Sequence, residues 1–274
     1  KIMTTDNMNY PPQVTTDAVM DGIIDRFDSD LAADGRIMNL EFFDNQGYKY
    51  TAQFSVHETP TSDKGNFIVQ LDEIRNPDGK VVYDGVADAA TKATFGEPTI
   101  TIGTGADAKT YTNAVYLNFV DGKGTFMGVG ANDTATDKTA TLKLPSSNFT
   151  NTADELPAGK NSNEIVIDFT GCLNYNKNGT STMGALAGDK KGLGAGLKVG
   201  EMSGVTVQKD GKIYATYDNG QRKLLGQIAA ASFANPSGLA KQGDNLYSST
   251  SFNSFPATSA ILEDTCFVLW EICT

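Results

Sequence analysis

Basic clusters and long apolar runs are both absent from this sequence, and each absence excludes a class of protein. Its 22 Lys and Arg residues face 33 Asp and Glu residues, which gives a net charge of −11. That balance argues against nucleic acid and anionic membrane surfaces as partners, because both bind basic patches. No stretch approaches the roughly 18 apolar residues of a membrane-spanning helix. We therefore expect neither nucleic-acid binding nor membrane insertion.

The amino terminus and the cysteines also lack familiar signals. The opening stretch KIMTTDNMNYPPQ has neither the apolar segment of a cleavable signal peptide nor an initiator Met, so we expect a fragment or a processed form. The cysteines Cys172, Cys266 and Cys273 are too few and too scattered for a disulfide framework. Cys266 could pair with Cys273, although free thiols are the favoured interpretation. Cysteine usage therefore does not identify the compartment.

Catalytic and metal-binding residue types are scarce. His57 is the single histidine, and a Ser-His-Asp hydrolase needs only one, but no Gly-x-Ser-x-Gly elbow is present. We interpret His57 as a surface or edge residue at the end of a strand over residues 48–56. The three cysteines lack the spacing of a zinc site. A glycosidase carboxylate pair could be hidden among the acidic residues, because such a pair is assembled in space. We expect no catalytic residue, metal or cofactor.

Two short motifs resemble ligand loops only superficially. The acidic stretch at residues 28–30 begins like a calcium loop, but counting from Asp28 positions five and six are alanines and position twelve is Asn39. We interpret it as a solvated loop. The glycine-rich stretch at residues 192–196 follows Asp189-Lys190-Lys191 and precedes no helical pattern, unlike a phosphate-binding loop. We expect a flexible hinge or interdomain linker there.

Alternating strand patterns dominate the rest of the chain. Runs at residues 37–43 and 48–56 flank the turn Asp44-Asn45-Gln46-Gly47, and runs at 67–74 and 81–84 flank Asn76-Pro77-Asp78-Gly79. Residues 14–27 are interpreted as extended or weakly helical. Further strands are expected at residues 99–102, 111–119, 125–129, 139–144 and 164–169. These patterns, with 28 glycines, predict an all-β chain of short antiparallel strands in a sandwich or barrel-like domain.

Residues 204–247 predict a β-meander. Runs at 205–207 and 212–217 are separated by Asp210-Gly211, and Asp218-Asn219-Gly220 leads into an apolar run at 224–233 that ends in the corner Asn235-Pro236-Ser237-Gly238. The Gly- and Ala-rich change of composition at residues 174–200 predicts a boundary before it. We expect an outer β domain at 1–200, with a small inserted subdomain considered at about 85–140, and the meander of a second β domain at 201–250. A tail follows at 251–274, with 267–270 as a candidate final strand.

Three motifs, in order along the chain, resemble the bacterial flagellar hook protein family. The first is Asn39-Leu40-Glu41-Phe42-Phe43-Asp44-Asn45-Gln46-Gly47. The second comprises Leu117-Asn118-Phe119, Asp121-Gly122-Lys123-Gly124 and Ile165-Val166-Ile167-Asp168-Phe169-Thr170-Gly171. The third and most specific covers residues 200–247, including Leu225-Gly226-Gln227-Ile228 and Gly243-Asp244-Asn245-Leu246-Tyr247. Related distal rod proteins share parts of this third motif, so the first two favour the hook.

The resemblance implies a non-enzymatic structural subunit of the curved, flexible tube that joins the motor rod to the filament. It implies self-assembly, rod, hook-cap and hook–filament junction proteins as partners, and export to the cell exterior without a cleaved signal peptide. The family's terminal helical segments are missing and residues 251–274 depart from its pattern, so we expect incomplete cover of the meander's apolar residues: Val205, Val207, Ile213, Tyr217, Leu225 and Ile228. Some family members cross-link a cysteine to a lysine of a neighbouring subunit; for Cys172 an inert thiol is the favoured interpretation.

Two alternatives remain open from the residues themselves. The Thr-, Asn- and Asp-rich loops would also suit a secreted or surface adhesin or carbohydrate-binding β module. A hydrolase that uses His57 or a carboxylate pair is the other alternative.

Overall fold

The computed structural model describes residues 4–32, 34–59, 65–84, 93–105, 108–145, 163–228, 237, 239–243 and 246–248. The chain forms two compact units. The larger unit is Pro11–Val199, and the smaller one combines Lys1–Tyr10 with Gly200–Thr274. Both units are built from strands, which confirms the predicted all-β class. No described helix is long and apolar enough to span a membrane.

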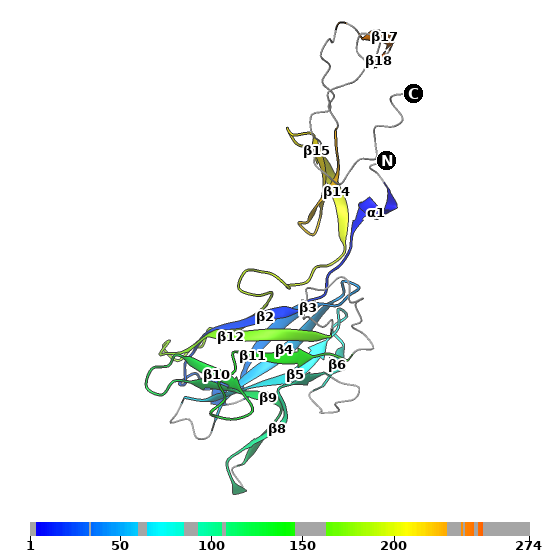
Figure 1. Cartoon of the computed structure of the whole chain (residues 1–274). Helices are drawn as coiled ribbons and strands as arrows, with labels where there is room; N and C mark the ends of the chain where they lie inside the picture. The colour runs from blue at the N-terminus through cyan, green and yellow to red at the C-terminus, as the bar shows by residue number, and fades with distance from the viewer. Residues whose placement is uncertain are drawn as a thin grey trace. The chain divides into compact units, whose positions relative to one another are not determined.

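Two sheets make up the larger unit (Figure 1). One has the order β10-β9-β5-β4-β3, with β6 paired to β5 and β8 paired to β9. Its strands are β3 (Arg36–Phe43), β4 (Lys49–Glu58), β5 (Phe67–Arg75), β6 (Val81–Tyr83), β8 (Glu97–Ile102), β9 (Lys109–Phe119) and β10 (Phe126–Gly130). The other has the order β13-β2-β12-β11-β7. Its strands are β2 (Asp17–Ile24), β7 (Thr94–Phe95), β11 (Thr139–Lys143), β12 (Glu164–Asn174) and β13 (Gly184–Ala187), and a short helix, α2 (Ser29–Ala32), follows β2.

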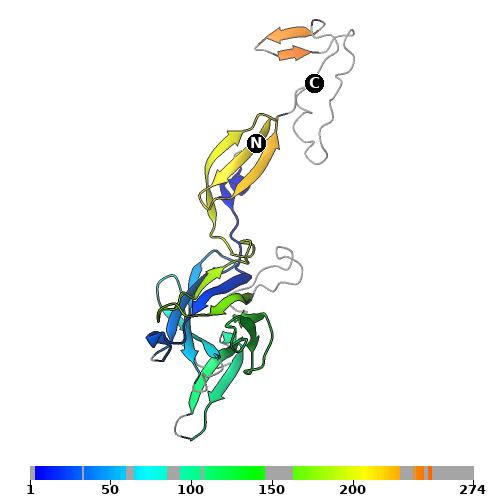
Figure 2. The ribbon, with the colours of Figure 1, turned by 90° about the vertical axis from the view of Figure 1, so that its left-hand side faces the viewer.

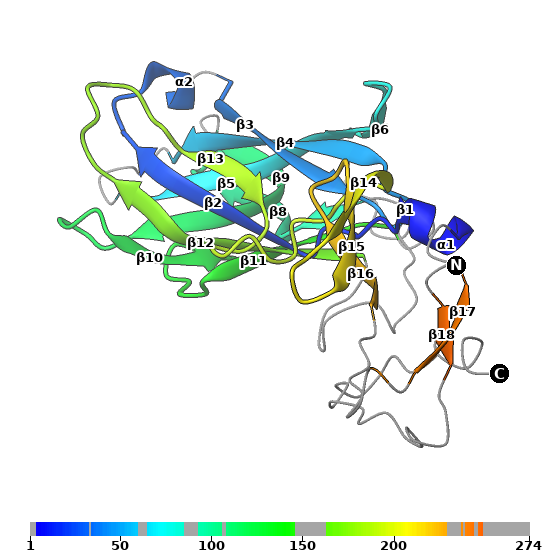
Figure 3. The ribbon, with the colours of Figure 1, turned by 90° about the horizontal axis from the view of Figure 1, so that it is seen from above.

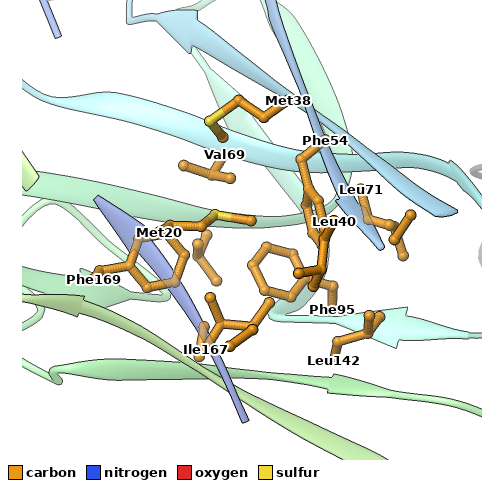
Figure 4. Packing of buried hydrophobic residues seen from close by; sticks show 14 of the residues in the cluster. Met20, Met38, Leu40, Phe54, Val69, Leu71, Phe95, Leu142, Ile167 and Phe169 are labelled. Carbon is orange, nitrogen blue, oxygen red and sulfur yellow. The ribbon is translucent and has the colours of Figure 1, made fainter. Parts of the chain in front are cut away.

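The main core lies between these two sheets (Figure 4). Alternate residues of a strand point to opposite faces, and in β4 the inward set Ala52, Phe54 and Val56 is fully buried. The Phe54 ring meets the Phe95 ring of β7 edge to face, with centroids 5.1 Å apart. Because β4 and β7 belong to different sheets, this aromatic pair connects the two layers.

The predicted hairpins of the larger unit are confirmed, and their turn chemistry explains why. Asp44 Oδ1 accepts the backbone N–H groups of Gln46 at 2.9 Å and Tyr48 at 2.8 Å. Gly47 then adopts a φ of +83°, which other residues rarely adopt. The turn after β5 is stabilised in the same way, because Asn76 Oδ1 accepts the backbone N–H groups of Asp78 and Lys80. Local side-chain chemistry therefore determines these turns.

Residues 17–24 form a strand, the extended one of the two conformations considered for residues 14–27, because β2 pairs in parallel with β12 on one side and antiparallel with β13 on the other. Figure 3 shows β2 and β12 side by side, pointing the same way. The glycine-rich residues 192–196 are not a hinge. Gly194 O accepts the N–H groups of Thr16 at 2.9 Å and Asp17 at 3.2 Å, so this turn is fixed to the start of β2.

The smaller unit contains the predicted meander (Figure 2). Its sheet has the order β1-β14-β15-β16, formed by β1 (Asn9–Tyr10), β14 (Gly200–Val207), β15 (Lys212–Tyr217) and β16 (Arg222–Gln227). A short helix, α1 (Thr5–Met8), precedes β1, and β17 (Ala240–Gly243) pairs with β18 (Leu246–Ser248). Of the corner expected at residues 235–238 only Ser237 is described, and the strand expected at 267–270 lies outside the described residues.

The expected exposure of the meander is confirmed in part. Val205, Val207 and Ile228 are exposed, at 42%, 59% and 58%. Tyr217 contradicts the expectation, because only 2% of it is exposed. The ring of Tyr10 packs against it edge to face at 5.4 Å, so the amino-terminal segment covers that end of the sheet.

Candidate functional site

His57 lies on the face of the larger sheet opposite the main core. It alternates with the buried Val56 on β4, and its ring is 5.1 Å from the ring of Tyr111. A Cβ on Gly35 would come within 2.5 Å of the imidazole, so the loop before β3 also packs on this ring. Of the two positions considered, sheet edge and surface, the edge is wrong, since β4 lies between β3 and β5; the ring is half-buried on the outer face near the end of β4.

The structure brings Ser55, His57 and Asp72 together, but in an order that does not suit a hydrolase. Ser55 Oγ lies 2.9 Å from His57 Nε2 and donates its proton to Asp72 Oδ1 at 2.8 Å. In a catalytic triad the histidine lies between the serine and the carboxylate and accepts the serine's proton. Here the hydroxyl proton goes to Asp72, so His57 must donate to Ser55. The contact therefore orders the sheet surface and does not activate a nucleophile.

Burial favours the neutral form of both titratable groups in this contact, His57 and Asp72. It lowers the pKa of His57 below its usual 6.5, and the Lys109 charge adds to that effect. Burial raises the pKa of Asp72 above its usual 3.8, against the hydrogen bonds from Ser55 and Gln70. Desolvation disfavours the charged form of each group. Both pKa shifts are those expected for a half-buried cluster with a structural role.

The acidic loop after β2 is a structural joint. Asp25 accepts three backbone N–H groups, from Phe27 at 3.0 Å, Lys177 at 2.6 Å and Gly179 at 2.8 Å. Asp28 accepts the N–H of Ser181 at 2.7 Å. These bonds join residues 25–28 to residues 177–181, more than 150 positions later. Within the described part of the chain, no group of three or more His, Cys, Asp or Glu side chains could hold a metal ion.

Cys172 is buried in the main core, and its Sγ donates to Met20 O at 3.2 Å. Burial raises the pKa of this thiol to about 12. The reactive species of a cysteine is the thiolate. Cys172 is therefore an inert thiol in the folded larger unit, in line with the favoured interpretation.

A cleft of about 460 Å³ opens at one end of the larger unit. Four segments that are far apart in the sequence form its walls: the loop after β2, Gly65 before β5, the turn after β9 and the segment at the end of β12. The lining residues are Asp25, Arg26, Phe27, Gly65, Phe119, Val120, Asp121, Gly122, Lys123, Gly124, Asn174, Tyr175 and Asn176. Its lining therefore combines two cations, two carboxylates, aromatic rings and amide groups.

The walls of this cleft are held by backbone hydrogen bonds. Asn174 N donates to Gly124 O at 2.8 Å, and Tyr175 N donates to Ile24 O at 3.1 Å. Gly124 has a φ of +64°, and a Cβ there would lie 2.0 Å from Asn174 O, so only glycine allows this approach. The cleft thus has a fixed shape before anything binds.

Two aromatic side chains remain exposed at the cleft. Phe27 is 71% exposed, with the Arg26 guanidinium carbon 4.8 Å from its ring centroid, and Tyr175 is 42% exposed. Sequence analysis did not identify this site. None of its segments carries a local motif for it. The pairing of β2 with β12 brings the first and last segments together, and the bond from Asn174 N to Gly124 O adds the turn after β9.

Comparisons with known proteins find flagellar hook proteins among the relatives of this chain. The chain is 28% identical to "Flagellar hook protein FlgE" of Escherichia coli (strain K12) over 175 residues, which are 56% of this chain and 43% of that protein. It is 44% identical over 55 residues to the FlgE of Salmonella typhimurium, covering 20% of this chain and 14% of that protein. With the FlgE of Borreliella burgdorferi it shares 46% identity over 56 residues, covering 20% and 13%.

The chain is related to the flagellar hook proteins. The resemblance noted in the sequence is thereby confirmed, and it supports a hook protein over an adhesin or a hydrolase. No protein-family model matches the chain. The chain spans less than half the length of these hook protein relatives. A crystal structure of Helicobacter pylori flagellar hook protein FlgE2 aligns with 77% of this chain and 36% of its own, at 15% identity and a TM-score of 0.34.

Proposed function

We propose that this chain is a structural subunit of the bacterial flagellar hook, the curved and flexible tube that joins the motor rod to the filament. The observation that carries the proposal is the sequence relationship with proteins named flagellar hook protein over more than half of the chain. Because the chain covers less than half of that relative, the role of a whole hook subunit is part of the proposal.

The physical character of the larger unit supports this role. A tube that bends as it rotates needs subunits that keep their fold while the contacts between them change. The core between the two sheets is continuous and closed by pairs such as Phe54 and Phe95. In this proposal residues 11–199 supply an outer β domain, and residues 1–10 join the meander that begins at Gly200 in a second one.

The same proposal assigns no catalysis to the chain. The Ser55–His57 contact has the wrong order for a nucleophile and its base, which supports a non-enzymatic role. The partners would be other copies of the chain in a helical tube, together with rod, hook-cap and hook–filament junction proteins. The site of action would be the cell exterior, reached without a cleaved signal peptide.

Deletion of the gene in its own host tests the proposal. We expect non-motile cells whose isolated basal bodies end at the rod, and recovery of hooks when the gene is returned on a plasmid. Basal bodies that still carry complete hooks after deletion would contradict the proposed function. A loss that begins within the rod would instead indicate a distal rod protein.

A further inference from the structure

We propose that the cleft of the larger unit receives the turn Asn76-Pro77-Asp78-Gly79-Lys80 of a second copy, so that copies join head to tail. This inference rests on the proposed function, because it names the surface through which a hook subunit would contact its neighbour.

Two cations and two carboxylates line the cleft, and the Asp25 carboxylate is buried and accepts three backbone N–H groups, so Asp121 is its exposed acid. Arg26 and Lys123 are both exposed at its walls, and Asp121 is exposed beside Lys123. Phe27 and Tyr175 add exposed aromatic surface to the same walls. The partner that fits is therefore a short segment with a carboxylate for the cations and an apolar group for the rings.

The turn after β5 has these groups. Pro77, Asp78 and Lys80 are all exposed, so the turn carries an apolar ring, an acid and a base. In the proposed contact Asp78 faces Lys123 and Arg26, Pro77 packs on the aromatic rings, and Lys80 faces Asp121. The acid and the base of the turn thus each face an opposite charge of the cleft.

The turn is also rigid before any contact forms. Asn76 Oδ1 accepts the N–H of Asp78 at 3.1 Å and the N–H of Lys80 at 2.9 Å. Arg75 Nη1 donates to Gly79 O at 3.0 Å, which closes the turn from the strand side. The cleft is equally fixed by its backbone bonds. Joining two ordered surfaces costs less conformational entropy than ordering a loop on binding.

The fold places the cleft and the turn at opposite ends of the larger unit. Gly65 lines the cleft just before β5 begins at Phe67, whereas the turn follows the end of β5 at Arg75. A strand of this length spans about 30 Å. Figure 3 agrees, with α2 near one end of the unit and β6 at the other.

This separation determines what repeated contacts produce. When a surface at one end of a molecule binds a different surface at the other end of the next copy, the contact is heterologous. An assembly of any number of copies then still offers one free cleft at one end and one free turn at the other, so the contacts generate a ring or an open helical array. An open array is the arrangement that a tube subunit needs.

Charge reversal tests the pairing in the chain itself. Lys123→Glu and Asp78→Lys should each weaken self-association about tenfold, measured by sedimentation equilibrium, because each turns an attraction into a repulsion. The double variant restores the opposite-charge pair and should return to within about threefold of the unaltered chain. Lys138→Glu and Asp133→Lys change exposed charges outside both surfaces and should leave association unchanged.

A photo-cross-linking residue in place of Phe27 identifies the occupant directly. In a mixture of unlabelled and ¹⁵N-labelled copies, we expect cross-links from position 27 to a peptide containing residues 76–80 of the other copy. The same residue placed at Tyr48, which is 55% exposed, should give no cross-link to that peptide. Circular dichroism of each variant verifies that its fold is retained.

Three results would overturn the inference: an unaltered chain that stays monomeric up to millimolar concentration, single charge reversals without effect, or cross-links from position 27 to a different peptide. Each leaves the gene-deletion experiment untouched, so failure of this contact is distinguishable from failure of the proposed function. Rescue by the double variant, together with the 27-to-76–80 cross-link, would establish the contact.

Discussion

The Tyr217 hydroxyl donates a hydrogen bond to the backbone carbonyl of Asn7 at 2.9 Å, across 210 positions of the sequence. The Tyr10 ring packs on the same side chain, so the amino-terminal segment and the meander form one structure. Tyr217 is accordingly buried, whereas Val207 at the other end of the sheet is 59% exposed. The first prediction concerns this bond.

Tyr217→Phe removes the hydroxyl but keeps the ring between Tyr10 and the sheet. We expect the smaller unit to lose about 1 kcal/mol of stability, the usual net contribution of one hydrogen bond. Hydrogen exchange of the β14 and β15 amides measures it, because this readout is local to the unit. Tyr214→Phe, on the same strand with its ring 5.1 Å from the Arg222 guanidinium carbon, is the matched control and should change exchange little.

The aromatic pair between the two sheets governs the stability of the larger unit. Phe54→Ala should cost about 3–5 kcal/mol, because it removes a fully buried ring that contacts Phe95 and leaves a cavity. Ile37→Ala, at a side chain that is 56% exposed, should cost less than about 0.5 kcal/mol. Urea unfolding of both variants measures these two losses of stability. Equal losses for the two would show that the core does not lie between the sheets.

Burial of Cys172 predicts the chemistry of its thiol. In a Cys266→Ser/Cys273→Ser variant, the remaining thiol should stay unmodified by a thiol reagent at pH 8 in native buffer and react fully in denaturant. The reason is that its pKa of about 12 leaves almost no thiolate, and the core excludes the reagent. Fast modification of the native protein, read by mass spectrometry, would refute the inert assignment.

Asp25 makes stability depend on pH in the acid range. The N–H of Lys177, then those of Phe27 and Gly179, hold the pKa of this carboxyl below its ordinary 3.8, so the folded state prefers the charged form. The contribution of Asp25 to stability is fully present above about pH 3.8, and it is lost as the pH falls through the lower pKa of the folded state. Asp25→Asn should therefore lower the free energy of unfolding at pH 7 by about 1–3 kcal/mol. It should also reduce the further loss of stability as the pH falls below about 4.

The measurement for Asp25 is the free energy of unfolding as a function of pH. Asp133→Asn, at an exposed carboxylate, should keep the slope of the unaltered chain. Parallel curves for Asp25→Asn and the unaltered chain would mean that the three backbone bonds do not favour the ionised form.

The parts of the fold that local chemistry determines were predictable. The hairpin at Asp44–Gly47 needs an acceptor side chain and a glycine with positive φ, and both are visible in the sequence. By contrast, β2 was interpreted as extended or weakly helical, because its partners β12 and β13 lie about 150 positions away. The cleft was missed for the same reason: the β2–β12 pairing brings Phe27 near Tyr175, and the distant backbone bond from Asn174 N to Gly124 O brings Lys123 to them.

We propose that this chain forms part of the hook itself. Gold-labelled antibody against the larger unit, applied to isolated hook–basal bodies and viewed by electron microscopy, tests it most directly. We predict label along the whole curved tube between rod and filament, with none on the gene-deletion strain. Label confined to the rod or the filament, or absent from intact hooks, would contradict it.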